Sequence, residues 1–270
     1  ILDVMSGETD QEGRWREVYA SGEVLDTKLS IHDRYSSIPI DITKEIRESL
    51  SFKNNENLLD IGCGTGKFLN DLRQSGHNGL LVGLDISSGG FSREYESDDT
   101  QFVQASGLSL PLPNSHFKFV TSLHALSHIK VMDSLMSEVK RVLASDGSFL
   151  VTANSLANYT HVREFRDRVF ESRGWGTAKF TTNTFNAENA NGILSSYWQN
   201  VETKIVEGEL QIPANMFKNY FEANIPVCDH QPNETEKQEI LDEVNTWAHK
   251  VAKNGFITEP KWMSFSVCTD

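Results

Sequence analysis

The sequence has 270 residues and a formal net charge of −13, with 38% hydrophobic and 23% charged residues. The length fits one large α/β domain, or a standard domain with added segments, and the composition is ordinary for a folded enzyme. No run of 18 apolar residues occurs, so no membrane-spanning helix is predicted. The acidic balance disfavours a nucleic-acid partner, because binding to phosphates normally needs a basic surface.

The three cysteines (Cys63, Cys228 and Cys268) are scattered along the chain. They have neither the density of a disulfide framework nor the paired spacing of a zinc site. We therefore expect a reducing, cytoplasmic location and no metal. The printed chain starts at Ile1, so a targeting segment ahead of it stays an open alternative.

The first 50 residues are predicted to form an N-terminal helical cap segment. Residues 10–22 read as one helix that stops at Gly22. In residues 41–50 the apolar side chains of Ile42, Ile46 and Leu50 recur every four residues, which indicates one face of a second helix.

Residues 51–154 alternate between short apolar runs and amphipathic helices, a pattern typical of βαβ units and a parallel sheet. The strands are expected at 58–61, 79–85, 101–104, 117–123 and 148–153, with helices at 67–74 and 131–144.

Residues 155–270 follow a different order. A helix is predicted in 155–175, and alternating strands are predicted at 201–212 and 261–268. Between these two strands, helices at 213–221 and 234–253 would form an inserted helical substrate lid (213–258). The complete prediction is a Rossmann-like, seven-stranded, mainly parallel sheet with its last strand antiparallel, flanked by helices and covered by this lid.

The run Leu58-Leu-Asp-Ile-Gly-Cys-Gly-Thr-Gly-Lys-Phe68 joins a buried strand to a helix through a glycine-rich turn. Glycines suit such a turn because the backbone must bend tightly and allow a ligand to approach closely. The glycines stand at 62, 64 and 66, whereas a dinucleotide fingerprint would need a glycine at Lys67. A P-loop is excluded because no Gly-Lys-Ser/Thr follows. A glycine turn without any ligand is the remaining plain alternative.

This segment resembles motif I of the class I S-adenosylmethionine-dependent methyltransferases, in particular the methyltransferase type 11 group. The resemblance runs from about Leu58 to Ala153. It implies that S-adenosyl-L-methionine is the cofactor and S-adenosyl-L-homocysteine the product. It also implies that the motif holds the methionine part of the cofactor, through contacts from Asp60, Gly62, Cys63, Gly64 and Gly66.

Asp85 closes the second strand, 23 positions after Gly62. A carboxylate at such a strand end can accept hydrogen bonds from both ribose hydroxyls, and the resemblance places Ile86 against the adenine. The alternative for Asp85 is a capping or loop acid. Ser106 stands where the family commonly has an aspartate near the adenine, so Ser106, Gly107 and Leu108 are the expected adenine contacts.

His124 and His128 follow the fourth predicted strand, where the resemblance implies residues that line the cofactor and the substrate. Their four-residue spacing also suits metal binding, but no third ligand is evident. We therefore expect no metal, with His124 in the active site, where the resemblance implies that it also contacts the cofactor, and His128 in a structural role.

The segment Asp33-Arg34-Tyr35-Ser36 resembles one that folds over the cofactor in many relatives. Arg34 would pair with the cofactor carboxylate, and Tyr35 would meet that carboxylate or the substrate; ordinary loop packing is the alternative. If the acceptor needs a general base, His124 is the first candidate, followed by Tyr35 and His161.

The aromatic residues outside the core and the acidic balance favour a small-molecule metabolite or natural product, methylated on oxygen or nitrogen. Three alternatives stay open: an RNA or protein methyltransferase, a cofactor-binding partner subunit without catalysis, and another transfer reaction from the same sulfonium. The sequence leaves the oligomeric state open, a homodimer included.

Overall fold

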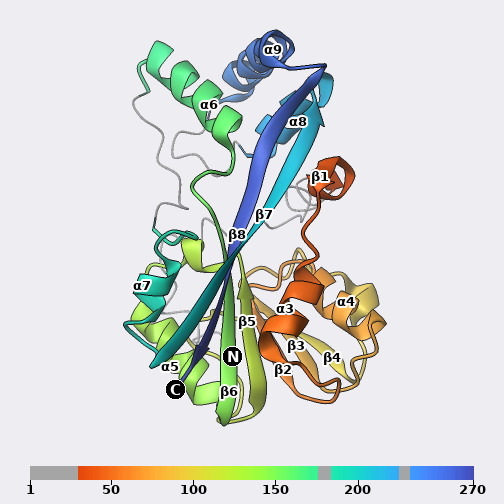
Figure 1. The fold of residues 1–270 in the computed structure, drawn as a ribbon, viewed down its shortest axis with the longest axis vertical. Helices are drawn as coiled ribbons and strands as arrows, with labels where there is room; N and C mark the ends of the chain where they lie inside the picture. Colours follow the sequence, from red (N-terminus) through yellow and green to blue (C-terminus); the bar gives the residue numbers. More distant parts are fainter. Residues whose placement is uncertain (1–29, 176–183, 225–231) are drawn as a thin grey trace.

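The computed structural model describes residues 30–175, 184–224 and 232–270, and a mixed β-sheet forms the centre of this part of the chain (Figure 1). The described residues contribute eight strands, in the spatial order β1-β7-β8-β6-β5-β2-β3-β4. Their bounds are β1 Ser36–Ile38, β2 Leu58–Ile61, β3 Leu81–Asp85, β4 Thr100–Gln104, β5 Phe117–Leu123, β6 Leu143–Asn154, β7 Asn200–Pro213 and β8 Phe256–Thr269.

Strands β2 to β6 run parallel, and the strand order reverses between β2 and β5. Every residue of β2 is buried, as expected for a parallel strand covered on both faces. Ligands of open α/β sheets bind beyond the carboxyl ends of the strands at such a reversal. The topology therefore places a candidate site at the end of β2.

Helices cover both faces of the sheet. Apolar residues of α3 (Ile42–Leu50) and α4 (Lys67–Gln74) pack into one core cluster with β2, β5 and β8. Residues of α5 (Met132–Val142) and α7 (Ala190–Leu194) belong to a second cluster on the other face. The predicted Rossmann-like class is thereby confirmed.

The strand count differs from the prediction, because β1 adds an antiparallel edge strand beside β7. With only three residues, β1 is too short to show an alternating pattern in the sequence. Strand β8 lies antiparallel between β6 and β7, as predicted for the last strand.

The link between β3 and β4 contains a short 3₁₀ helix, Arg93–Tyr95, instead of a full crossover helix. At this place Phe91 stacks on Phe102 of β4, with ring centroids 5.2 Å apart. An aromatic pair thus supplies apolar cover beside the outer strands.

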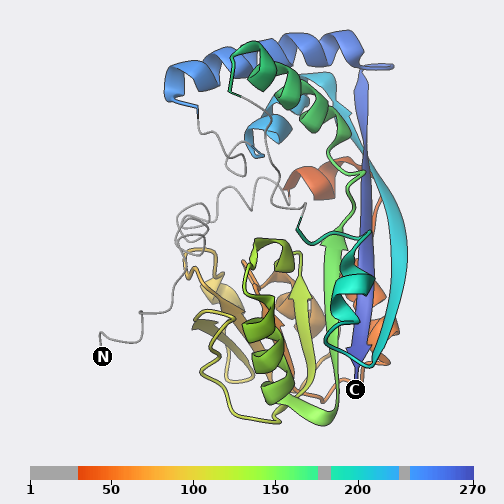
Figure 2. The ribbon, with the colours of Figure 1, turned by 90° about the vertical axis from the view of Figure 1, so that its left-hand side faces the viewer.

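Strands β7 and β8 pair over fourteen residues each and extend beyond the end of β6, whose last partner is Met263. Three helices pack against this extension: α6 (Thr160–Ser172), α8 (Ala214–Glu222) and α9 (Glu234–Val251) (Figures 1 and 2). Their apolar side chains form a separate core with β7 and β8. We call this part the upper helical body.

Helices α8 and α9 are inserted between β7 and β8, at the place of the predicted lid (213–258). A side-chain capping box of Asn233 and Glu236 fixes the start of α9. The predicted helix at 10–22 lies outside the described residues.

Candidate functional site

The glycine-rich turn follows β2 at the carboxyl edge of the sheet. Gly62, Gly64 and Gly66 all have positive φ angles (77°, 55° and 80°), a conformation that favours glycine. A Cβ atom on Gly66 would lie 2.3 Å from the Phe102 ring, and one on Gly62 would lie 2.5 Å from the Cβ of Ala125. Backbone conformation therefore favours glycine at all three positions, and close packing also requires it at Gly62 and Gly66.

Asp60 is buried near the end of β2, with 1% of its surface exposed. The Thr121 hydroxyl donates a hydrogen bond to Oδ1 of Asp60 at 2.8 Å. Burial raises the pKa of Asp60 to about 7; the Thr121 hydrogen bond opposes this shift and the charge of Asp85 adds to it. A buried carboxyl group of this kind favours a cationic ligand group, which would offset its lost hydration.

Asp85 ends β3, and its carboxylate links two loops. The backbone N–H of Gly64 donates to Oδ2 at 2.9 Å, and that of Ser87 donates to Oδ1, also at 2.9 Å. Burial raises the pKa of Asp85, while hydrogen bonds from backbone amides act against the shift. A carboxylate oxygen has two lone pairs, so each can still accept a hydroxyl donor.

Cys63 and Ile86 flank this pair of acids, and both side chains are half-buried. Burial raises the pKa of the Cys63 thiol well above its ordinary value, so the thiol stays protonated at neutral pH. The carbonyl of Ile86 accepts a hydrogen bond from the Gln104 amide at 3.1 Å.

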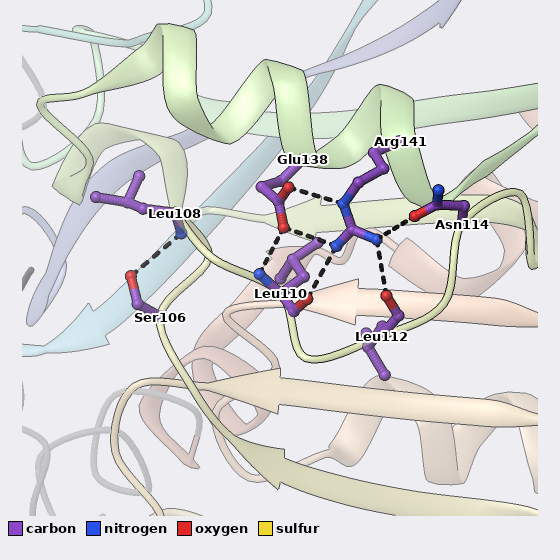
Figure 3. Close-up of polar contacts among 7 residues, drawn as sticks. All are labelled: Ser106, Leu108, Leu110, Leu112, Asn114, Glu138 and Arg141. Carbon is purple, nitrogen blue, oxygen red and sulfur yellow. Dashed lines mark hydrogen bonds and ion pairs between the residues drawn. The ribbon is translucent and has the colours of Figure 1, made fainter. Parts of the chain in front are cut away.

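The loop after β4 holds Ser106, Gly107 and Leu108, and Figure 3 shows Ser106 and Leu108. The Ser106 hydroxyl accepts a hydrogen bond from the Leu108 N–H at 3.1 Å. A Cβ atom on Gly107 would lie 3.2 Å from Ile61, so the loop packs tightly on the end of β2.

Two charged residues of α5 hold the next part of this loop, as Figure 3 shows. Glu138 accepts from the Leu110 N–H at 2.7 Å, and Arg141 donates to the carbonyls of Leu110 and Leu112 at 2.9 and 2.8 Å. Arg141 also binds the Asn114 side chain at 2.7 Å and forms an ion pair with Glu138. The loop conformation therefore depends on α5.

His124 directly follows β5 and adopts the left-handed conformation, with φ of 60°. Its backbone N–H donates to the carbonyl and hydroxyl of Thr152 at 3.2 and 3.1 Å. Its buried Nδ1 has no hydrogen-bond partner among the described residues. Burial, assisted by the charge of Lys261, lowers the pKa of His124 to about 4.

His124 lines a small recess at the ends of β5 and β6. The other lining residues are Ser127, Thr152, Ala153, Asn154 and Phe185. A neutral imidazole with an available nitrogen beside hydroxyl and amide groups can orient a polar acceptor atom or receive a proton.

Arg34 and Tyr35 lie at the end of a helical stretch (30–35) that leads into β1. The Arg34 side chain is exposed, and Tyr35 packs against the core of the upper helical body. The pKa of Lys67 is raised, chiefly by its hydrogen bond to Asp71, with a smaller contribution from the charge of Asp33. The charge of Asp33, the residue before Arg34, therefore acts on Lys67 at the start of α4.

His161 belongs to the first turn of α6, in the upper helical body. Its Nδ1 lies 3.6 Å from the Glu259 carboxylate, which raises the pKa of His161. The structure thus pairs His161 with β8, whereas Asp60, Asp85 and the glycine turn lie together at the ends of β2 and β3.

Sequence reasoning did not find Thr121, Thr152, Glu138 or Arg141 as parts of this site. Thr121 and Thr152 lie within apolar strands, where a threonine is unremarkable, and the α5 pair resembles an ordinary surface ion pair. The strand register brings Thr121 beside Asp60, and Thr152 binds the backbone of His124. Glu138 and Arg141 reach the site because the loop after β4 packs against α5.

No cluster of three or more potential metal ligands occurs within residues 30–175, 184–224 and 232–270. No helix in this part of the chain has the length and apolar character needed to cross a membrane.

Comparison with known proteins relates the same residues to a family. A family model described as a methyltransferase domain matches residues 59–151. The chain is 31% identical over 111 residues to the sterol 4-C-methyltransferase strm-1 of Caenorhabditis elegans, an alignment that covers 39% of this chain and 33% of that protein. It is 28% identical over 155 residues to the 27-O-demethylrifamycin SV methyltransferase of Amycolatopsis mediterranei, covering 54% and 52%. The chain spans only about a third to a half of the length of these relatives.

A solved structure extends the likeness in fold. The phosphoethanolamine N-methyltransferase 2 of Haemonchus contortus, in complex with phosphomonomethylethanolamine and S-adenosylhomocysteine, superposes with a TM-score of 0.58. The sequence identity is 14%, and the superposition covers 97% of this chain and 60% of that one. Residues 59–151, which the methyltransferase domain model matches, contain the glycine turn, Asp60 and Asp85. The resemblance of this chain to the class I S-adenosylmethionine-dependent methyltransferases is therefore confirmed.

Proposed function

We propose that the protein is an S-adenosylmethionine-dependent methyltransferase that transfers a methyl group to an oxygen or nitrogen atom of a small molecule. The observation that carries this proposal is the meeting of the glycine turn with two carboxylates, Asp60 and Asp85, at the ends of adjacent parallel strands. The match of residues 59–151 to a methyltransferase domain supports the same conclusion.

The groups present fit this cofactor chemically. The buried Asp60 would favour its positively charged methionine end, beside the backbone of Gly62, Cys63, Gly64 and Gly66. Asp85 would accept the ribose hydroxyls, and Ile86, Ser106, Gly107 and Leu108 would surround the adenine. Arg34 and Tyr35 would approach the carboxylate of the methionine part. The cofactor supplies a methyl group on a sulfonium, which an acceptor atom displaces in line.

The task of the protein is then to align the acceptor with the methyl carbon. Such positioning contributes on the order of 7–11 kcal/mol to catalysis in favourable cases. His124 would hold or accept the proton of the acceptor through Nδ1, because its lowered pKa keeps the imidazole neutral at physiological pH. Tyr35 and His161 are second candidates for this role. The inserted helices (213–258) would cover the acceptor as a lid.

The acidic surface does not favour RNA as the acceptor. The net charge is −13, and residues 186–270 contain no arginine. A small organic acceptor and a cytoplasmic location fit this balance, and no described feature specifically favours a protein acceptor or a non-catalytic subunit.

Calorimetric titration with S-adenosylmethionine and S-adenosylhomocysteine, with NAD as a control, tests the cofactor assignment. We expect micromolar binding of the two sulfur nucleosides and none of NAD. Absence of binding by either nucleoside would contradict the proposal. Transfer of a radiolabelled methyl group to a panel of hydroxyl and amine compounds would then distinguish an oxygen from a nitrogen acceptor.

A further inference from the structure

Glu259 on β8 is a carboxylate buried in the upper helical body, with 0% of its surface exposed. Its Oε1 accepts hydrogen bonds from the backbone N–H groups of His161 and Val162 at 2.9 and 3.2 Å, at the start of α6. Its Oε2 is also buried, and no described residue donates a hydrogen bond to it. Oε1 thus serves the helix start and also lies 3.6 Å from Nδ1 of His161, whereas neither contact uses Oε2.

Tyr159 directly precedes α6, whose first backbone N–H groups this carboxylate binds, and its ring belongs to a chain of aromatic contacts. The rings of Tyr159 and Tyr220 stack with centroids 6.0 Å apart, and the His32 ring meets Tyr220 edge-on, also at 6.0 Å. Burial raises the pKa of both tyrosines; the charge of Glu259 adds to each shift, and the charge of Arg163 opposes it at Tyr159. The group of Glu259, Tyr159, Tyr220 and His32 is called the Glu259 cluster below.

The backbone of Tyr159 is held in an unfavourable conformation. Its φ is 61°, in the left-handed region that a bulky residue rarely occupies. Among the described non-glycine residues with positive φ, only His124 and Tyr159 are large, and each follows the carboxyl end of a central strand. Strain of this kind concentrates at functional sites, where a side chain must be held in a particular direction.

The Glu259 cluster lies beyond the same edge of the sheet as the glycine turn and His124. Asn158 binds Trp262 through both its amide nitrogen and its oxygen, at 2.8 and 2.7 Å, which ties the start of α6 to β8. The last residue of β6 pairs with Met263. Glu259 stands four residues further along β8, or about 13 Å at the usual rise of a strand.

We propose that the Glu259 cluster binds a positively charged ammonium group of the methyl acceptor. A carboxylate oxygen without a partner and the faces of aromatic rings both attract a cation, and a bulky alkylated ammonium uses both. Because Glu259 lies about 13 Å along β8 beyond the end of β6, the ammonium of the acceptor would lie several bonds away from the atom that is methylated. This inference rests on the proposed function and adds the chemical class of the acceptor.

Choline and its uncharged carbon isostere, 3,3-dimethyl-1-butanol, provide matched probes of this site. Binding is measured by ligand-observed NMR and calorimetry, with and without S-adenosylhomocysteine. We expect wild-type protein to bind choline at least about ten-fold more tightly than the isostere, as a desolvated cation–π and charge contact would give. Equal binding of the two probes, or no binding of choline, would overturn the inference.

Glu259→Gln keeps an oxygen that can cap α6 but removes the charge. We expect the preference for choline to disappear while the affinity for S-adenosylhomocysteine stays within about two-fold. Glu239→Gln, an exposed glutamate on α9, makes the same charge change away from the cluster and should keep the preference. A Glu259→Gln protein that folds and still prefers choline would contradict the assignment.

A second variant covers the case in which Glu259→Gln does not fold. Tyr159→Gly removes one ring, and glycine adopts the left-handed backbone without strain. We expect at least about five-fold weaker choline binding, and unchanged binding would overturn the inference. Because the choline titrations are also run without nucleoside, failure of S-adenosylhomocysteine to bind would count against the proposed function alone.

Discussion

At the residue scale, the two acids at the strand ends have different surroundings. Asp60 lies almost entirely within the protein beside one hydroxyl, whereas Asp85 is half-buried and receives backbone amides from two loops. Burial disfavours the negative charge of Asp60 unless a cationic ligand group binds beside it. The surroundings of Asp85 hold its carboxylate in a fixed direction, as recognition of hydroxyl groups requires.

Asp85→Ala should weaken the binding of S-adenosylmethionine by about 10- to 100-fold, because hydrogen bonds to a charged acceptor contribute roughly 1.5–3 kcal/mol each. Calorimetric titration measures the change. Asp98→Ala, an exposed acid ahead of β4, serves as the control and should bind normally. An unchanged affinity in Asp85→Ala would refute the ribose assignment.

Asp60→Asn should alter the pH dependence of stability. The folded-state pKa of about 7 lies above the ordinary value of 3.8, so the folded protein holds this proton more tightly between these pH values. The stability of the wild type must therefore fall as pH rises through this window, by up to about 4 kcal/mol from this group. The variant lacks this loss, so it should gain stability relative to the wild type from pH 5 to pH 8 in urea unfolding without ligand. A constant difference between the two proteins would contradict the burial of a proton at Asp60.

His124→Gln tests the acceptor side of the site. If His124 holds the acceptor proton, we expect methyl transfer to slow by about 100-fold or more while S-adenosylhomocysteine binds as before. His116→Gln changes an exposed histidine just ahead of the same strand, at its opposite end, and should remain fully active. Normal turnover in His124→Gln would remove His124 from the mechanism.

At the scale of elements, the loop after β4 depends on α5. Glu138 and Arg141 bind backbone groups of the loop as well as each other. The pKa of Glu138 is lowered, mainly by its hydrogen bond to Arg141. The cofactor side of the loop, with Ser106 and Leu108, is thus tied to a helix on one face of the sheet.

Arg141→Met should release this loop. The variant leaves two backbone carbonyls, the Asn114 side chain and Glu138 without their donor, so we expect a loss of about 1–3 kcal/mol in the free energy of unfolding. Binding of S-adenosylmethionine should weaken several-fold, because the loop that would contact the adenine is no longer held in place. Lys140→Met, which removes an exposed ion pair with Asp270, should change little. Urea unfolding and calorimetry on both variants check the prediction, and equal behaviour of the two would disprove it.

At the scale of the whole molecule, two long strands join two separately packed bodies. The sheet and its covering helices form one part, the upper helical body forms the other, and β7 and β8 pass through both (Figure 2). Gly208 lies where β1, β7 and β8 meet: a Cβ atom there would lie 2.9 Å from the carbonyl oxygens of Ile38 and Lys261.

Gly208→Ala should destabilise the protein by about 1–3 kcal/mol, because these backbone oxygens cannot move aside without displacing paired strands. Gly192→Ala in α7 has no atom within 4 Å of the new methyl group, and it should be neutral or stabilising. Thermal unfolding of the two variants provides the comparison. If Gly208→Ala were as stable as Gly192→Ala, the close packing at this junction would be wrong.

The sequence determined the parallel core and the position of the glycine turn. Apolar strands such as Leu58–Ile61, the helical periodicity behind them and the spacing of Gly62, Gly64 and Gly66 are local patterns, and backbone sterics and burial act on them residue by residue. The inserted helices between β7 and β8 were predicted on the same basis. A local pattern also predicted that Asp60 lies near the end of one strand and that Asp85 closes the next strand along the chain.

Tertiary structure alone decided which distant groups meet. The edge strand β1, the hold of Arg141 on the loop at 110–114, the pairing of His161 with Glu259 and the rings of Tyr159 and Tyr220 join segments from 27 to 174 residues apart. These contacts depend on the pairing of β7 with β8 and on how each helix packs, which are set by the total burial of many side chains rather than by any short pattern. For this reason the cofactor side of the site could be predicted from the sequence, whereas the surroundings of the acceptor required the fold.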